Sequence, residues 1–213
     1  NCTSLTSITD PEGIDKLTDY MFANTGFEII NLPATITNIS GVGVFSNCKN
    51  LRTVKFADNT VVEKWSTIGD KAFYNCEKLE SIRIPSGVSE IGGWDEGQAF
   101  ANCTRLREIT IPEKVTEIKT ETFVNCTVLK SVNLHENITK IGQKAFGYCG
   151  ALEQINLGDK ITEIGIGAFL KACISPHRSQ DYPARYSCVA ASSVLSYPTT
   201  SHISTSSVLD YRR

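Results

Sequence analysis

The stretch that decides the fold runs from Asn102 to Phe123 and reads NCTRLREITIPEKVTEIKTETF. Its final phenylalanine is followed three residues later by Cys126, and this Phe-x-x-Cys spacing returns along most of the chain. Two further copies, at Phe22 and Phe169, have Thr25 and Ala172 in the cysteine slot. The complete pairs are Phe45/Cys48, Phe73/Cys76, Phe100/Cys103, Phe123/Cys126 and Phe146/Cys149.

Successive slots are 23, 28, 27, 23, 23 and 23 residues apart (48−25, 76−48, 103−76, 126−103, 149−126 and 172−149). A fixed period of roughly 20–30 residues is the signature of a solenoid, in which each repeat forms one coil and is stabilised by its neighbours. The sequence therefore predicts an α/β repeat solenoid of about seven coils over residues 1–173. The two longer periods place insertions in Asn59–Thr67 and Gly92–Gln98. The pattern stops after Cys173, so residues 174–213, rich in Ser, Thr and Pro, are predicted to be a disordered or non-native tail.

One coil can be interpreted residue by residue. Ile109 and Ile111 are two residues apart, which places both side chains on one face of a short strand. Pro112 cannot donate to a ladder, so the strand is expected to end there. The glycine after the last inner isoleucine, as at Gly69 and Gly142, suggests a corner with positive φ. We expect the segment from this corner to the cysteine to carry one helical or 3₁₀ turn, with Phe and Cys facing the interior.

The string from Ile111-Pro112 through Phe123 and Asn125-Cys126 to Val132 resembles the repeat of the BspA-like (Treponema-type) leucine-rich-repeat family, with Lys119 where glycine is usual. The resemblance covers roughly residues 1–173. It implies a right-handed horseshoe with a parallel β-sheet on its concave face. It also implies a surface-exposed or secreted microbial protein that adheres to host proteins or to other cells.

The outward positions of the predicted strands carry polar side chains that differ from coil to coil. A polar, non-identical face on the concave sheet is where such solenoids usually bind partners. The alternative is a solvated sheet face without a ligand. The candidate protein-binding residues are Thr53, Lys55, Ser81, Arg83, Glu108, Thr110, Ser131, Asn133, Gln154 and Asn156.

Both tryptophans, Trp65 and Trp94, fall inside an insertion, in consecutive coils. Tryptophan is enriched at binding hot spots, so the two rings could form one aromatic patch for a partner. The favoured alternative is that both rings fold back over the lengthened coils, because large exposed apolar patches are uncommon on soluble proteins.

The cysteines are predicted to form a buried column of reduced thiols. No two of them are closer than 15 residues (188−173), so the C-x-x-C spacing of a metal site is absent from the sequence. Disulfides between neighbouring coils are the alternative. The asparagines that precede most of these cysteines are expected to bond the backbone of the next coil.

The sequence predicts no catalytic, cofactor-binding or metal site. Its three histidines, His135, His177 and His202, belong to no recognisable triad or ligand pattern. A net charge of −2 offers no electrostatic case for nucleic acid. No apolar run approaches the ~20 residues that cross a bilayer.

These observations favour a non-catalytic protein-binding solenoid on a microbial cell surface or in its secreted fraction. Its expected partners are proteins, with host and extracellular-matrix proteins as candidates. The alternative from another class is an intracellular, cytoplasmic leucine-rich-repeat scaffold, and a third is the targeting arm of an enzyme. The chain begins in mid-pattern at Asn1-Cys2, which we interpret as a fragment of a longer protein.

Overall fold

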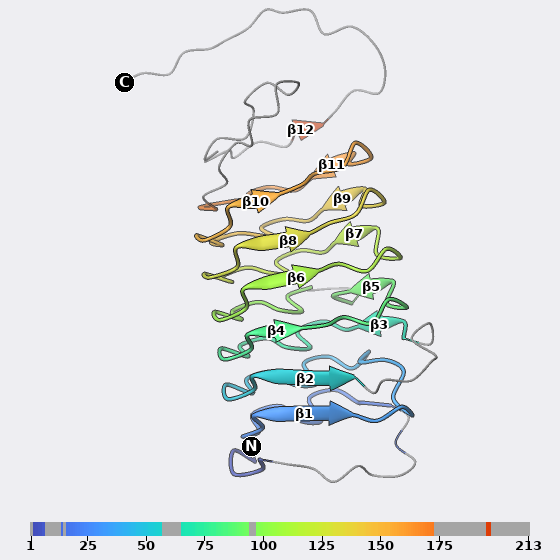
Figure 1. Cartoon of the computed structure of the whole chain (residues 1–213), viewed down its shortest axis with the longest axis vertical. Helices are drawn as coiled ribbons and strands as arrows, with labels where there is room; N and C mark the ends of the chain where they lie inside the picture. Colours follow the sequence, from blue (N-terminus) through green and yellow to red (C-terminus); the bar gives the residue numbers. More distant parts are fainter. Residues whose placement is uncertain are drawn as a thin grey trace, which may run out of the picture.

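The structure is a computed structural model, and it describes residues 2–6, 14, 16–56, 65–93, 97–172 and 195–196. Short coils stack on one another as a column, so that equivalent strands of successive coils lie side by side (Figure 1). All pairings between successive coils are parallel, which makes the molecule a parallel β-solenoid. The predicted repeat solenoid is therefore confirmed in its architecture.

One side of the coils carries the first strand of each repeat, and we call it the long-strand side. Its strands form two parallel sheets, β1-β2-β4 and β6-β8-β10. Residue Ile30 pairs with Val54, and Ile109 with Val132, so inner residues meet inner residues across each ladder. The strands are β1 (Ile29–Leu32), β2 (Thr53–Phe56), β4 (Ser81–Ile82), β6 (Glu108–Thr110), β8 (Ser131–Asn133) and β10 (Gln154–Ile155).

A second side carries a two-residue strand in each coil, and we call it the short-strand side. The sheets here are β3-β5 and β7-β9-β11, and β12 (Leu195–Ser196) adds to β11 in antiparallel orientation. The inner residue of each strand is an isoleucine. The strands are β3 (Thr67–Ile68), β5 (Glu90–Ile91), β7 (Glu117–Ile118), β9 (Lys140–Ile141) and β11 (Glu163–Ile164).

The third side, which we call the turn side, contains the Phe-x-x-Cys segments. The expected helical or 3₁₀ turn is wrong, because the described residues contain hydrogen-bonded turns and no helix. Glu121 and Asn125 have φ of 52° and 60°, a backbone conformation that a right-handed helix excludes. Because residues with positive φ are interspersed with residues of negative φ along this segment, backbone N–H groups of one coil point at the next coil. Phe123 N, for example, donates to Ala145 O at 2.8 Å.

Columns of equivalent side chains fill the interior, as predicted. The rings of Phe45, Phe73, Phe100, Phe123 and Phe146 are fully buried, and successive rings stack with centroids 5.3–5.5 Å apart. A phenylalanine in such a column contributes ~1.5–3 kcal/mol through burial alone. The stack is thus held by contacts that no single coil can make by itself.

The corner glycines serve a different purpose from the one predicted. Positive φ is found at Gly92 but not at Gly69, Gly142 or Gly165. At Gly142, an added Cβ would lie 2.6 Å from Thr120 N, which belongs to the backbone of the preceding coil. These corners need glycine because two backbones approach each other too closely for a side chain.

The predicted number of coils and the horseshoe shape are not confirmed. From β1 to β10 the chain makes about five complete turns. The predicted single concave sheet is divided, since β4 and β6, both described, do not form a ladder. Residues 173–194 and 197–213, which make up most of the predicted tail, lie outside the described part of the chain; within that tail Leu195–Ser196 forms β12.

Candidate functional site

The candidate binding residues lie in register on the long-strand side. Thr53 pairs with Ser81 in the first sheet, and Glu108, Ser131 and Gln154 follow one another in the second. The alternate positions are Lys55 in β2, Thr110 in β6 and Asn133 in β8, with Arg83 and Asn156 one residue beyond the ends of β4 and β10. Thr53 and Ser131 are half-buried and the other eight are exposed. The structure therefore brings the residues into two columns, divided between two sheets.

Charge on this face is unevenly distributed. The first sheet presents two cations, Lys55 and Arg83, whereas the second presents Glu108 among neutral hydroxyls and amides. Arg52, just before β2, is neutralised by Glu80 at 3.1 Å. No carboxylate of a described residue pairs with Lys55 or Arg83. The first sheet therefore offers the more positive part of the face.

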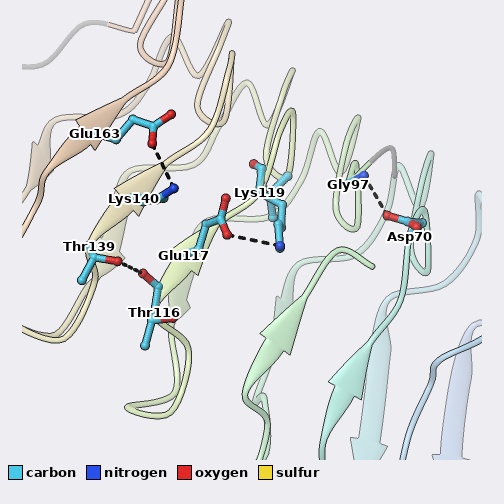
Figure 2. Close-up of polar contacts among 9 residues, drawn as sticks. Asp70, Gly97, Thr116, Glu117, Lys119, Thr139, Lys140 and Glu163 are labelled. Carbon is cyan, nitrogen blue, oxygen red and sulfur yellow. Dashed lines mark hydrogen bonds and ion pairs between the residues drawn. The ribbon is translucent and has the colours of Figure 1, made fainter. Parts of the chain in front are cut away.

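The short-strand side is polar but internally satisfied (Figure 2). Lys140 and Glu163, from neighbouring coils, form an ion pair at 3.1 Å, and Lys119 pairs with Glu117 at 3.2 Å. The hydroxyl of Thr139 donates to Thr116 O at 3.1 Å, one coil earlier. These side chains are engaged with one another, which leaves fewer of them available to a partner than on the long-strand side.

The cysteine column is buried and reduced among the described residues. Each thiol donates to the carbonyl oxygen of the phenylalanine in the preceding coil, for example Cys126 Sγ to Phe100 O at 3.3 Å and Cys149 Sγ to Phe123 O at 3.1 Å. Burial raises the pKa of Cys126 well above its ordinary value and that of Cys149 to about 12. These thiols are packing groups and not nucleophiles, because the thiolate is the reactive form.

Other parts of the cysteine prediction have separate outcomes. Cys2 is exposed, whereas Cys173 and Cys188 lie outside the described residues. Among the residues that the structure describes, no group of three or more His, Cys, Asp or Glu could hold a metal ion. No helix in the described part is long and apolar enough to span a membrane.

The asparagine column has a role that sequence reasoning missed. Asn47, Asn75, Asn102 and Asn125 all have φ between 56° and 61°, which asparagine tolerates better than most residues. Their half-buried amides bond each other rather than the backbone: Asn75 Nδ2 donates to Asn47 Oδ1 at 2.8 Å, and Asn125 Nδ2 to Asn102 Oδ1 at 2.9 Å. The expected amide-to-backbone bonds were therefore wrong for these two pairs. The sequence signal for this column was the return of asparagine directly before the cysteine in successive coils.

The described tryptophan and histidine are both structural. Trp65 is 4% exposed and packs edge-on against Phe56, with ring centroids 4.8 Å apart. Trp65 thus covers its lengthened coil, as the favoured alternative expected. Trp94 lies outside the described residues, so the aromatic patch of Trp65 and Trp94 forms no part of the proposed site. His135 accepts from Asn137 N at Nδ1 and donates from Nε2 to Pro112 O at 2.7 Å. Nε2 therefore joins two coils, while Nδ1 is used within the coil of His135 itself.

Short parallel strands, columns of buried leucine, isoleucine and phenylalanine, and a polar sheet side together define a leucine-rich-repeat solenoid. Six copies of the BspA type leucine rich repeat region match this chain, over residues 1–94 and 66–178. The chain belongs to this BspA-type leucine-rich-repeat family. Such repeat proteins generally serve in interactions between proteins and not in catalysis.

Solved structures agree with this assignment. A leucine rich cell surface protein from Faecalibacterium prausnitzii A2-165 is 32% identical with a TM-score of 0.67, over 79% of this chain and 44% of that protein. The chain thus spans less than half of that relative's length. The leucine rich repeat protein of T. pallidum is 24% identical with a TM-score of 0.68, over 78% of this chain and 75% of that one, and supports the fold. A search of curated proteins returned no match.

Proposed function

We propose that this chain is a non-catalytic, protein-binding part of a microbial cell-surface protein and that its partners bind on the long-strand side. The observation that carries the proposal is the pair of registered columns of exposed polar side chains on β2, β4, β6, β8 and β10. Variable side chains on a regular sheet allow one scaffold to match a particular partner. In this proposal residues 1–173 form the binding unit, and 174–213 form a separate tail.

The location at the cell surface is supported by the relative from F. prausnitzii, which is described as a cell surface protein. We propose adhesion as the role, with host or extracellular-matrix proteins as partners. Lys55 and Arg83 favour partners with acidic segments, because complementary charges speed association and select among partners. The polar residues of the second sheet, Thr110 and Asn133 among them, would add hydrogen bonds to the same partner.

A binding assay tests the proposed face. The purified chain is applied to immobilised extracellular-matrix proteins, and Lys55→Glu with Arg83→Glu is compared with the parent. We expect Kd to rise by about tenfold or more, because two attractions become repulsions. The matched control is Lys114→Glu with Lys160→Glu, which makes the same charge change in exposed turns between the two strand sides. Equal binding by both double variants would remove the long-strand side from the proposal.

The proposed location is tested separately through the full reading frame. A signal peptide and a membrane or wall anchor encoded with this chain are expected, together with labelling of intact cells by an antibody to the solenoid. A complete frame without either sorting signal, and antibody access only after lysis, would instead support an intracellular scaffold with the same fold.

A further inference from the structure

The stack of coils is interrupted on both strand sides at the same junction, between the coil of β4 and β5 and the coil of β6 and β7. On the long-strand side, β2 pairs with β4 and β6 with β8, but β4 and β6 form no ladder. On the short-strand side, β3 pairs with β5 and β7 with β9, but β5 and β7 do not pair. We call this junction the seam. All four strands beside it are described, so the interruption is a feature of the described chain.

Individual amides show the same interruption. At the next junction along the chain, between the coils of β7 and β9, Thr139 N donates to Thr116 O at 2.8 Å and Gly142 N donates to Ile118 O at 2.7 Å. The equivalent amides one coil earlier belong to Thr116 and Lys119, and neither donates to a described residue across the seam. On the long-strand side, Arg107 N still reaches Glu80 O, at 3.3 Å. The seam therefore has fewer backbone bonds than the junctions beside it.

Two side-chain ladders also stop at the seam, although the hydroxyl of Thr104 still donates to Glu77 O at 3.2 Å across it. Asparagine amides bond between Asn47 and Asn75 and between Asn102 and Asn125, but no bond joins Asn75 to Asn102 in the described structure. On the short-strand side, hydroxyl-to-carbonyl bonds join Ser89 to Ser66 and Thr139 to Thr116. The described contacts include no such bond between Thr116 and Ser89. These two ladders and the two sheets are interrupted at the seam, whereas the thiol contact of Cys103 and the hydroxyl contact of Thr104 cross it.

On the turn side, apart from the missing bond between Asn75 and Asn102, the ring, backbone and thiol contacts continue through the seam. The rings of Phe73 and Phe100 stack at 5.3 Å, and Phe73 N donates to Ala99 O at 2.8 Å. The thiol of Cys103 donates to Phe73 O at 3.3 Å. The carboxylate of Asp70 accepts from Gly97 N at 2.7 Å, as Figure 2 shows. Contact across the seam is therefore concentrated along one side of the solenoid.

The chain crosses the seam at an insertion. The insertion of this coil lies directly after β5, so the coil is 27 residues long where the next is 23 (103−76 and 126−103). The described residues that flank it include Gly92 and Gly97, with φ of 79° and 66°. The added length lies between β5 and the turn side, where the chain passes from one side of the seam to the other.

We propose that the seam divides the solenoid into two cooperative blocks, residues 16–93 and 97–172, which are hinged along the turn side and open on the strand sides. In repeat arrays stability is the sum of coil terms and nearest-neighbour interfaces, so the junction with the fewest bonds opens first. This proposal does not rest on the proposed function. In this proposal the two sheets of the long-strand side, β1-β2-β4 and β6-β8-β10, move as separate units, and the angle between them changes as the seam opens.

Hydrogen exchange resolved by residue tests the seam on the unmodified chain. The amides of Thr116 and Lys119 should exchange about tenfold or more faster than those of Thr139 and Gly142, which occupy the same positions one coil later. Equal protection of the two pairs would show that the seam is closed in solution and would overturn the proposal.

A matched pair of variants tests whether the blocks are independent. Val54 in β2 and Val132 in β8 are both 4% exposed at the same inner position. Val54→Ala should speed exchange in β2, β4 and β5 by about tenfold and leave β8 and β9 unchanged, and Val132→Ala should do the reverse. Faster exchange throughout the solenoid in either variant would show a single cooperative unit. If a variant fails to fold at all, that too contradicts independent blocks, because the other block should survive.

Discussion

Replacing Phe123 by alanine removes a ring from the middle of the aromatic column. Phe123 is 0% exposed and stacks on Phe100 at 5.5 Å and on Phe146 at 5.4 Å, with planes within 7° of each other. Phe→Ala changes in a packed core cost about 3–5 kcal/mol, through lost burial and the cavity left behind. Each stacked pair adds about 0.5–1.5 kcal/mol beyond burial. Because two pairs are lost, we expect a cost of about 5 kcal/mol, at the upper end of the range.

The measurement is urea denaturation in reducing buffer, followed by circular dichroism. Phe169→Ala is the matched control, because Phe169 is only partly buried and, among described rings, stacks on Phe146 alone at 5.5 Å. It should cost about half as much. Phe123→Leu should recover most of the loss, since leucine restores apolar volume but not ring stacking. A Phe123→Ala variant as stable as the parent, or less damaging than Phe169→Ala, would refute the reasoning about the buried column.

Three further predictions follow from the structure. Burial raises the pKa of the Cys126 thiol above its unfolded value near 9, so the unfolded chain loses this proton first as the pH rises. The contribution of this thiol to the free energy of unfolding should therefore be intact below pH 9 and fall by about 1.4 kcal/mol per pH unit above it. Denaturation midpoints at pH 8 and pH 10 should show a shallower fall for Cys126→Ala than for the parent, and identical slopes would argue against the buried thiol. Gly142→Ala places a Cβ 2.6 Å from Thr120 N and should lower the melting temperature, whereas Gly150→Ala, with nothing within 4 Å, should leave it nearly unchanged. Asn125→Ala should cost about 1–2 kcal/mol because of the positive φ, and Asn125→Gly should cost less; an equal loss in the two variants would assign the effect to the amide bond with Asn102, which both remove.

The columns of the interior could be predicted because the repeat places the same residue types at the same positions of every coil. Phe100, Phe123 and Phe146 share one environment, so a single interpretation of one coil applied to all of them. The buried, reduced thiols followed from the same argument. The register of Thr53 with Ser81, and of Glu108 with Ser131 and Gln154, follows the same period, while the binding role of the candidate residues remains a proposal.

The turn side could not be predicted in the same way. Its backbone conformation depends on hydrogen bonds to the next coil, such as Asn125 N to Gly147 O at 2.8 Å, and these have no counterpart within one repeat. The true function of Gly142 was hidden for a related reason. Its small size is required by the backbone of a neighbouring coil, and not by its own φ.

The sequence by itself determined the repeat, the inner and outer positions of each strand and the family, because periodicity and side-chain chemistry are local properties of the chain. Only the tertiary structure decided where ladders between coils form and where they stop. The interruption between β4 and β6 is a property of two coils together, and contacts between coils are not encoded within either coil alone.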